Sequence, residues 1–498
     1  MELATYLKIN PADSVVVCLQ AKKKGEIIDI DGKSIVLNQD TPAGHKVLIK
    51  DVKAGENIIK YGYPIGHARE DLKAGDWVNE NNLKTNLSGT LEYTYKPVDE
   101  PLSIAKENRT FKGYVRKNGD VGVRNEIWIV PTVGCVNGIA EQLVKRLREE
   151  TGCKDVDSIW SWHHNYGCSQ LSEDHENTRK VLRDICLHPN AGGVLVLSLG
   201  CENNQPEDFM AMLGDYDKDR IKLLVTQRVE GDEVEAGMQI LRELYNQAAQ
   251  DKRQNVPVSK LRIGLKCGGS DGFSGITANP LVGEFSDWLV AQGGTSVLTE
   301  VPEMFGAETI LMNRCETPQI FEQTVSMINN FKNYFLSHGE PVGENPSPGN
   351  KAGGISTLED KALGCTQKCG KAPVSGVMEY GDRLQNTGLN LLSAPGNDLV
   401  ASTALASCGC HIVLFTTGRG TPFGTFVPTM KVATNPVLAA RKPQWVDFNA
   451  GQLIEGRTMQ QLLPEFVDKV LAVASGEKAR NEENDYREIS IFKNGVTL

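Results

Sequence analysis

The 498-residue sequence contains no run of eighteen apolar residues, the length that a membrane-spanning helix needs. Its opening, MELATYLKIN, lacks the basic start and apolar core of a secretory signal, so we expect a cytoplasmic protein with no membrane partner. Basic residues are outnumbered, with 53 Lys and Arg against 63 Asp and Glu. The net charge of −10 argues against nucleic acid as a partner, and a small anion would need local cations to bind.

Low-complexity segments are also absent, and 40% hydrophobic and 23% charged residues are typical of a globular protein. The length allows roughly two to four domains with sizeable cores. Cysteine is abundant, with 12 residues. Without an export signal, these cysteines are expected to be buried thiols, metal ligands or catalytic groups rather than disulfides.

The patterning predicts a small β-rich domain followed by α/β domains with a mainly parallel sheet. Residues 1–95 contain short strands such as SVVVCL and KVLIK, and a repeated Asp-x-Lys-Ala-Gly motif that predicts two similar turns. Residues 96–110 are polar, contain two prolines and are predicted to be a linker. Apolar runs then alternate with helical patterns, which is typical of βαβ units. We expect α/β domains over 111–255 and 256–498, packed together as one catalytic body.

Three Gly-Cys pairs follow one another at intervals of 33 residues, at Cys135, Cys168 and Cys201, and Cys267 lies two such intervals further on. Each cysteine follows a predicted strand, so all four are predicted at the carboxyl edge of one parallel sheet, where open α/β sheets bind ligands. Such thiols could hold iron, as an ion or a cluster, or supply a nucleophile. Buried cysteines in βα units of equal length would give the same spacing, and that alternative stays open.

Two glycine-rich loops are candidate anion sites. CGGSDGFSGITANP (267–280) joins a predicted strand to a helix, and its backbone amides suit a carboxylate or phosphate. It is neither a Walker loop nor a dinucleotide fingerprint, and Asp271 is its one carboxylate. FTTGRGTPFG (415–424) presents Arg419 after an apolar run. Further candidates are Lys351 and the pair His45–Lys46, although a surface lysine and a structural histidine are the ordinary alternatives.

Long strings throughout the chain resemble the altronate and galactarate dehydratase family of sugar-acid hydro-lyases. IIKYGYPIGHA and AGDWV resemble its N-terminal SAF domain, and NGDVGVRNE, YGCSQ and LGCENN resemble its middle part. CGGSDGFSGITANP, NPSPGNKAGG, FTTGRGTP and DFNAG resemble the rest. Within the family, PTVGCVNGIA, TEVPEMFGAE and NLLSAPGND are closer to the altronate type than to the galactarate type.

The resemblance implies dehydration of D-altronate to 2-dehydro-3-deoxy-D-gluconate in hexuronate degradation, with Fe(II) or Mn(II) required, and we expect a homodimer. A base would take the C2 proton, and the C3 hydroxyl would then leave. The alternatives are a galactarate dehydratase, a lyase for a sulfonated acid, an iron–sulfur hydro-lyase with its cluster on the four cysteines, and a non-catalytic sugar-acid-binding protein.

The residues expected to act in this reaction fall into three groups. Proton transfer is assigned to one of three side chains: His45, Lys46 and Asp271. Substrate binding is assigned to two cations for the carboxylate and four polar side chains for the hydroxyls: Arg419, Lys351, Thr417, Thr421, Asn279 and Asn350. Metal binding is assigned to the four strand-end cysteines: Cys135, Cys168, Cys201 and Cys267.

Overall fold

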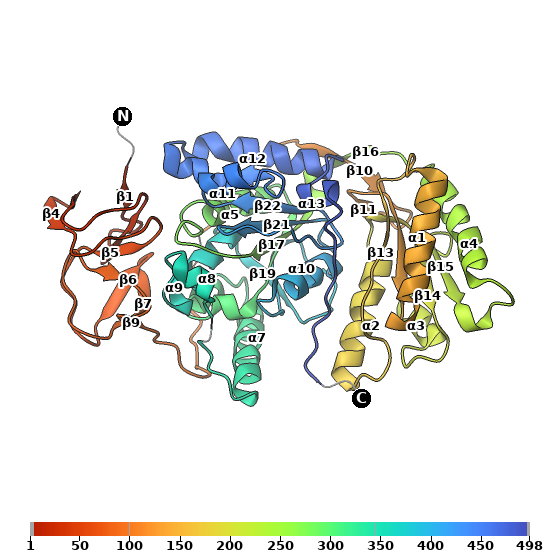
Figure 1. Cartoon of the computed structure of the whole chain (residues 1–498), viewed down its shortest axis with the longest axis horizontal. Helices are drawn as coiled ribbons and strands as arrows, with labels where there is room; N and C mark the ends of the chain where they lie inside the picture. Colours follow the sequence, from red (N-terminus) through yellow and green to blue (C-terminus); the bar gives the residue numbers. More distant parts are fainter. Residues whose placement is uncertain (1–3, 99, 344, 496–498) are drawn as a thin grey trace.

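The computed structural model describes residues 4–98, 100–343 and 345–495. Figure 1 shows a small β domain at one end, an α/β domain in the middle and a second α/β domain at the other end. The middle domain is formed by the C-terminal half of the chain. No described helix is both long enough and apolar enough to cross a membrane.

The N-terminal domain consists of short antiparallel strands. Its largest sheet has the order β1-β2-β5-β8, formed by Tyr6–Leu7, Val15–Cys18, Lys46–Leu48 and Trp77–Val78. β3 (Ile27–Ile30) and β4 (Lys33–Val36) form a hairpin, and β6 (Asn57–Lys60), β7 (Tyr63–Ala68) and β9 (Leu83–Lys84) form a third sheet.

The repeated Asp-x-Lys-Ala-Gly motif forms two turns that pair with each other. Val52 and Leu72 form a β-bridge between the turns. The Lys53 ammonium contacts Asp71 at 2.7 Å, and the Lys73 ammonium contacts Asp51 at 2.7 Å. The sequence-based prediction of two similar turns is therefore confirmed.

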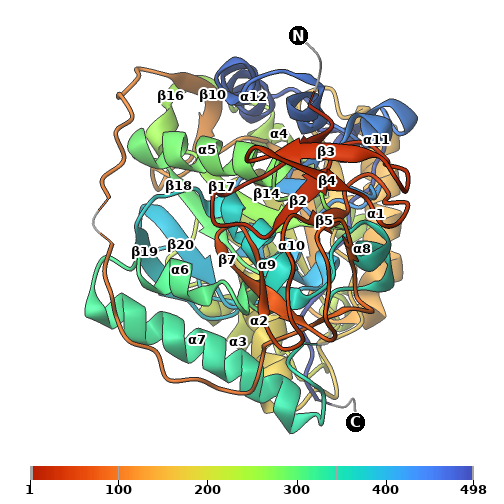
Figure 2. The same ribbon diagram turned by 90° about the vertical axis from the view of Figure 1, so that its left-hand side faces the viewer.

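An extended segment leads from this domain to the rest of the chain. Between Lys84 and Thr110 the described residues form no helix or strand. In Figure 2 this orange segment runs along one side of the molecule, past α7 (Pro318–Ser337) and up to β10 (Thr110–Val115). The Tyr93 hydroxyl donates to Glu308 at 2.6 Å, and the Tyr95 ring packs against Phe321, so the segment is anchored to the C-terminal half.

The second domain contains a four-stranded parallel sheet with the order β13-β12-β14-β15. The central strands β12 (Glu126–Pro131) and β14 (Ala191–Ser198) are buried along their whole length. β13 is Ile159–Ser161, β15 is Ile221–Val225, and the helices are α1 (Asn137–Thr151), α2 (Ser172–Cys186), α3 (Pro206–Met212) and α4 (Glu233–Ala248). A separate antiparallel sheet, β11-β10-β16, includes Val121–Gly122 and Gln254–Pro257, and its buried residues Phe111, Val121 and Val256 pack into the hydrophobic core of the C-terminal half.

The C-terminal half contains a seven-stranded parallel sheet with the order β19-β20-β18-β17-β21-β22-β23. Its strands, in chain order, are Arg262–Cys267, Thr295–Leu298, Val374–Met378, Gly388–Leu392, Ile412–Thr417, Thr429–Ala433 and Phe448–Asn449. Helices pack around it: α5 (Ala278–Ala291), α6 (Glu308–Met312), α7, α8 (Pro348–Ala352), α9 (Leu358–Cys365), α10 (Asp398–Ser407), α11 (Pro436–Arg441), α12 (Met459–Ala474) and α13 (Arg480–Glu483). The predicted fold, a β-rich N-terminal domain before α/β domains with parallel sheets, is confirmed.

The prediction that the four strand-end cysteines share one sheet edge is wrong. Cys135, Cys168 and Cys201 follow β12, β13 and β14 of the four-stranded sheet, whereas Cys267 ends β17 of the seven-stranded sheet. The reason is that β16 pairs antiparallel with β10 and ends the first sheet's βα repeat, so that β17 begins a new sheet. The equal spacing continued across a domain boundary that the strand pattern alone did not reveal.

Candidate active site

The glycine-rich loop after β17 is where the N-terminal domain, α8 and the Arg419 loop meet. The Gly272 amide donates to the Gly353 carbonyl at 2.7 Å. A methyl group on Gly272 would lie 1.8 Å from the Gly44 carbonyl oxygen, so the turn before His45 packs directly on this loop. Gly418 also packs closely on this loop, because a methyl group there would lie 2.2–2.6 Å from the carboxyl atoms of Asp271.

Gly272→Ala is expected to push the N-terminal domain away from this loop. The added methyl group meets backbone rather than a flexible side chain, so we expect a loss of about 1–3 kcal/mol in unfolding free energy, the usual effect of overpacking. Urea unfolding measures this loss. Gly138→Ala is the control, because a methyl group at Gly138 has no neighbour within 4 Å. Equal stability of the two variants would contradict the tight contact.

His45 and Lys46 reach the site from the N-terminal domain and are both held firmly. The Trp77 indole donates to His45 Nδ1 at 3.1 Å, which leaves the hydrogen on Nε2 for the Ala352 carbonyl at 3.3 Å. Burial lowers the pKa of His45, so the ring is neutral near pH 7. Burial also lowers the pKa of Lys46, but its Nζ donates to Gly354, Ser356 and Asp360 at 2.7–2.9 Å. These contacts favour a role in holding the domains together, and proton transfer by either residue stays a prediction.

Asp271 lies within the glycine-rich loop and is buried. Its carboxylate accepts hydrogen bonds from Thr434 at 2.9 Å, Asn435 at 3.0 Å and Ser274 at 3.1 Å. Burial raises the pKa of Asp271, although these hydrogen bonds act in the opposite direction. A carboxyl group with a raised pKa is suited to accept and return a proton at neutral pH.

Two cations without partners flank the same loop. Arg419 is exposed, its side chain lies against Gly269, and its guanidinium makes no hydrogen bond or ion pair with any described residue. Lys351 is half-buried, and its ammonium likewise has no partner in the described part of the chain. Gly269 and Lys351 both line a cavity of about 840 Å³, together with Gly268, Glu303 and Lys361. The pair provides local positive charge for an anion in a protein of net negative charge.

The four residues predicted to bind the sugar hydroxyls form hydrogen bonds within the protein that stabilise the loops around the site. Asn279 bonds with Thr416 at 2.7 Å and with the Gly364 carbonyl at 2.9 Å, which occupies both ends of its amide. Asn350 donates to the Ser270 carbonyl at 2.9 Å and caps α8. Thr417 and Thr421 accept from backbone amides two or three residues further along their loop. Direct contact of these side chains with a substrate stays a prediction.

Sequence reasoning missed a network of buried charges beneath the cavity. Lys266 is fully buried and contacts Glu300 and, at 2.8 Å, Asp398. Lys361 pairs with Glu303 at 2.8 Å, and both line the cavity. The signal was present in the strings TEVPEMFGAE and EDKALG, whose charged residues stand among buried apolar ones, but nothing in the sequence indicates that these distant strings meet.

Cys267 lies in this network rather than with the other strand-end cysteines. Its Sγ is 3.5 Å from Cys365 Sγ, and Cys365 Sγ is 3.2 Å from Glu303 Oε2. The hydrogen bond from Cys365 lowers the pKa of Cys267 below its usual range. Among the described residues, only Cys267, Glu303 and Cys365 bring three metal-ligand atoms within 4.8 Å of one another.

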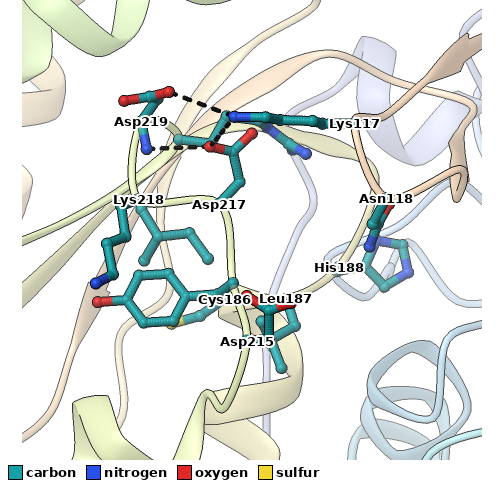
Figure 3. A pocket seen from close by; sticks show the side chains of 12 residues that line it. Lys117, Asn118, Cys186, Leu187, His188, Asp215, Asp217, Lys218 and Asp219 are labelled. Atoms are coloured by element: carbon teal, nitrogen blue, oxygen red, sulfur yellow. Dashed lines mark hydrogen bonds and ion pairs between the residues drawn. The ribbon is translucent and has the colours of Figure 1, made fainter.

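A second cleft, shown in Figure 3, lies at the amino ends of the strands in the second domain's parallel sheet. It is lined by residues just before β14 and β15, including His188, Asp217 and Asp219. Lys117 forms ion pairs with the two aspartates at 4.0 and 3.7 Å, and His188 contacts the Cys410 carbonyl at 3.1 Å. Because ligands of parallel sheets bind at the carboxyl ends of strands, this amino-end cleft is the weaker candidate.

Comparison with known proteins covers almost all of the chain. Three families of one group match it in order: the altronate/galactarate dehydratase SAF domain over residues 4–86, the D-galactarate dehydratase/altronate hydrolase second domain over 113–249, and the D-galactarate/altronate dehydratase C-terminal domain over 258–497.

Similar full-length proteins are altronate and galactarate dehydratases. The altronate dehydratase of Bacillus subtilis (strain 168) is 56% identical over 100% of both chains. The altronate dehydratase of Escherichia coli (strain K12) is 54% identical over 99% of this chain and 100% of its own. The galactarate dehydratase (L-threo-forming) of Escherichia coli (strain K12) is 34% identical over 95% of this chain and 94% of its own. The chain therefore belongs to the altronate and galactarate dehydratase family of hydro-lyases.

Proposed function

We propose that this enzyme dehydrates D-altronate to 2-dehydro-3-deoxy-D-gluconate, in the cytoplasm and as a homodimer. The assignment of D-altronate as the substrate rests on sequence identity. The chain is 54–56% identical to two altronate dehydratases over essentially their whole length, but only 34% identical to a galactarate dehydratase. The site is compatible with a sugar-acid carboxylate, because Lys351 lines the cavity and Arg419 lies against Gly269, which also lines it.

Arg419 and Lys351 bind the carboxylate in this proposal. Arginine offers a planar pair of N–H donors that matches a carboxylate, and lysine adds a point charge. Holding the carboxylate there stabilises the negative charge that develops when the C2 proton is removed, which is the difficult step of the reaction. Asp271, with its raised pKa and its place between Gly418 and Gly353, is the favoured proton-transfer group, and His45 and Lys46 are the alternatives.

The family resemblance also implies Fe(II) or Mn(II). The buried cluster of Cys267, Glu303 and Cys365 fits such an ion poorly. Lys361 Nζ is 2.8 Å from Glu303, and Lys368 lies near Cys267. These two ammonium groups already balance the negative charge of the carboxylate and the thiolate, and they would repel a divalent cation. A divalent ion, when bound, would act as a Lewis acid toward the carboxylate or the departing hydroxyl. We assign no step to an ion at Cys267, Glu303 and Cys365.

Anaerobically purified protein, supplied with iron, is expected to convert D-altronate to a 2-keto-3-deoxy acid, and removal of the metal by a chelator is expected to abolish the conversion. Detection of the keto acid by its coloured adduct and by mass spectrometry measures the reaction. D-Galactarate and sulfolactate serve as comparison substrates. Turnover of either one at a higher kcat/KM than D-altronate would overturn the substrate assignment, and binding without turnover of any of them would overturn catalysis.

A further inference from the structure

Three cysteines in the second domain differ from all the others in exposure. Cys135, Cys168 and Cys201 are exposed, whereas the remaining cysteines are buried, except Cys153, which is half-buried. The three follow β12, β13 and β14, which are neighbours in one parallel sheet with β12 in the middle. Neighbouring strands lie about 4.8 Å apart, so the three thiols are gathered at one sheet edge.

The loops that carry these cysteines are bonded to one another. The Gly134 amide donates to the Tyr166 carbonyl at 2.9 Å, which joins the first two loops. The Asn204 amide donates to the Gly167 carbonyl at 3.0 Å, which joins the third. A methyl group on Gly167 would lie 2.1 Å from the Thr132 carbonyl oxygen, so only glycine allows this approach directly before Cys168. These contacts fix the three cysteine-bearing loops relative to one another.

Polar groups at this edge are suited to a sulfur-rich ligand. Gln227 Nε2 donates to Cys201 Sγ at 3.3 Å, and Ser169 Oγ is 3.9 Å from Cys168 Sγ. Hydrogen bonds to sulfur are a usual means by which proteins tune iron–sulfur clusters.

The spread of the thiols favours a cluster over a single ion. The three sulfurs do not all come within 4.8 Å of one another, since among the described residues only Cys267, Glu303 and Cys365 do so. One ion would need its ligands to converge on it, whereas in a cluster each cysteine binds a different iron. We propose that Cys135, Cys168 and Cys201 hold a four-iron iron–sulfur cluster, each thiol losing its proton as its sulfur binds iron.

Three thiolates leave one of the four irons without a protein sulfur and open to an oxygen ligand. The C-terminal tail contacts both the helix that follows the Cys168 loop and the proposed substrate cavity. Asp174, in the first turn of α2 after the Cys168 loop, accepts from the Asn494 and Gly495 amides at 2.7 Å each. Phe492 of the same tail lines the cavity, and Figure 1 shows this tail passing between the two α/β domains beside α2. A role of the open iron in dehydration rests on the proposed function, whereas cluster binding does not.

The test is the iron and acid-labile sulfide content of the anaerobically reconstituted full-length protein, together with its visible absorption and electron paramagnetic resonance. We expect about four irons and four sulfides per chain. Cys135→Ser, Cys168→Ser and Cys201→Ser are each expected to lower both contents at least several-fold. Cys153→Ser, in the same domain, and Cys267→Ser, in the other sheet, are expected to keep wild-type contents.

Wild-type iron and sulfide contents in the Cys135→Ser, Cys168→Ser and Cys201→Ser variants would overturn the proposal. A wild-type protein that binds iron without sulfide would also overturn it. Circular dichroism checks that each variant is folded. If a variant does not fold, alkylation of the wild-type protein decides, because a cluster must protect these three thiols from iodoacetamide and its removal must expose them. A protein that holds the cluster but does not turn over altronate would contradict the proposed function alone. Turnover with iron but without sulfide would contradict the cluster alone.

Discussion

Replacing Arg419 with methionine is expected to raise the KM for D-altronate by about 10- to 100-fold. A charge-assisted hydrogen bond contributes about 1.5–3 kcal/mol, and a tenfold change in binding corresponds to about 1.4 kcal/mol. The guanidinium has no other described partner, so its removal leaves no buried charge unpaired and the fold is expected to be unchanged. Steady-state kinetics measure the effect.

Two further variants define the role of Arg419. Arg419→Lys keeps the charge but loses the planar pair of donors, so its KM is expected between those of the wild type and Arg419→Met. Arg441→Met is the matched control, because Arg441 is also an exposed arginine of the C-terminal half without a partner among the described residues. An unchanged kcat/KM in Arg419→Met would remove Arg419 from the substrate site.

Asp360→Asn is expected to lower the free energy of unfolding by about 3–5 kcal/mol, the usual effect of removing one member of a buried ion pair. Its carboxylate is fully buried and pairs with Lys46 at 2.8 Å and Lys60 at 2.9 Å. Both lysines come from the N-terminal domain, and the substitution leaves two buried ammonium groups without a counter-charge. We expect the N-terminal domain to separate from the site, and activity to fall with it.

Asp71→Asn is the control for this substitution. Asp71 pairs with Lys53 at 2.7 Å, but both side chains are more than half exposed and screened by water, so the loss of stability is expected to be much smaller. Urea unfolding and proteolysis of the extended segment measure the two variants. Despite burial, the two lysines lower the pKa of Asp360, so its stabilisation is present at neutral pH and is lost only as pH falls through that lowered pKa. Equal stability of the two variants would contradict the docking role.

Local patterns predicted most of the fold. The alternation of apolar runs and helical patterns identified strands such as β14 and helices such as α7 and α12, because hydrophobic periodicity reflects burial directly. The same reasoning missed the division into two sheets. β10 and β16 are far apart in the chain and pair at Thr110 and Pro257 among other positions, and no local pattern encodes such a pairing.

The candidate site was predicted in part for a similar reason. Glycine-rich loops after strands are local signals, and they led to Asp271 and Arg419, which the structure brings to one loop cluster. The pairing of Lys46 with Asp360 spans 314 residues, and that of Lys361 with Glu303 depends on the packing of two separate helical segments. Such contacts follow from the tertiary fold, so the sequence indicated the residues without their partners.

The most direct test of the account is a crystal structure of the metal-reconstituted Asp271→Asn variant with D-altronate bound. The amide introduced by this substitution cannot transfer the proton, so the substrate is expected to persist in the crystal. The account predicts that the carboxylate of altronate lies in the cavity beside Gly268 and Gly269, within hydrogen-bond distance of Arg419 and Lys351. Altronate bound elsewhere, such as in the cleft of Figure 3, or bound in this cavity with both cations turned away from it, would contradict the account.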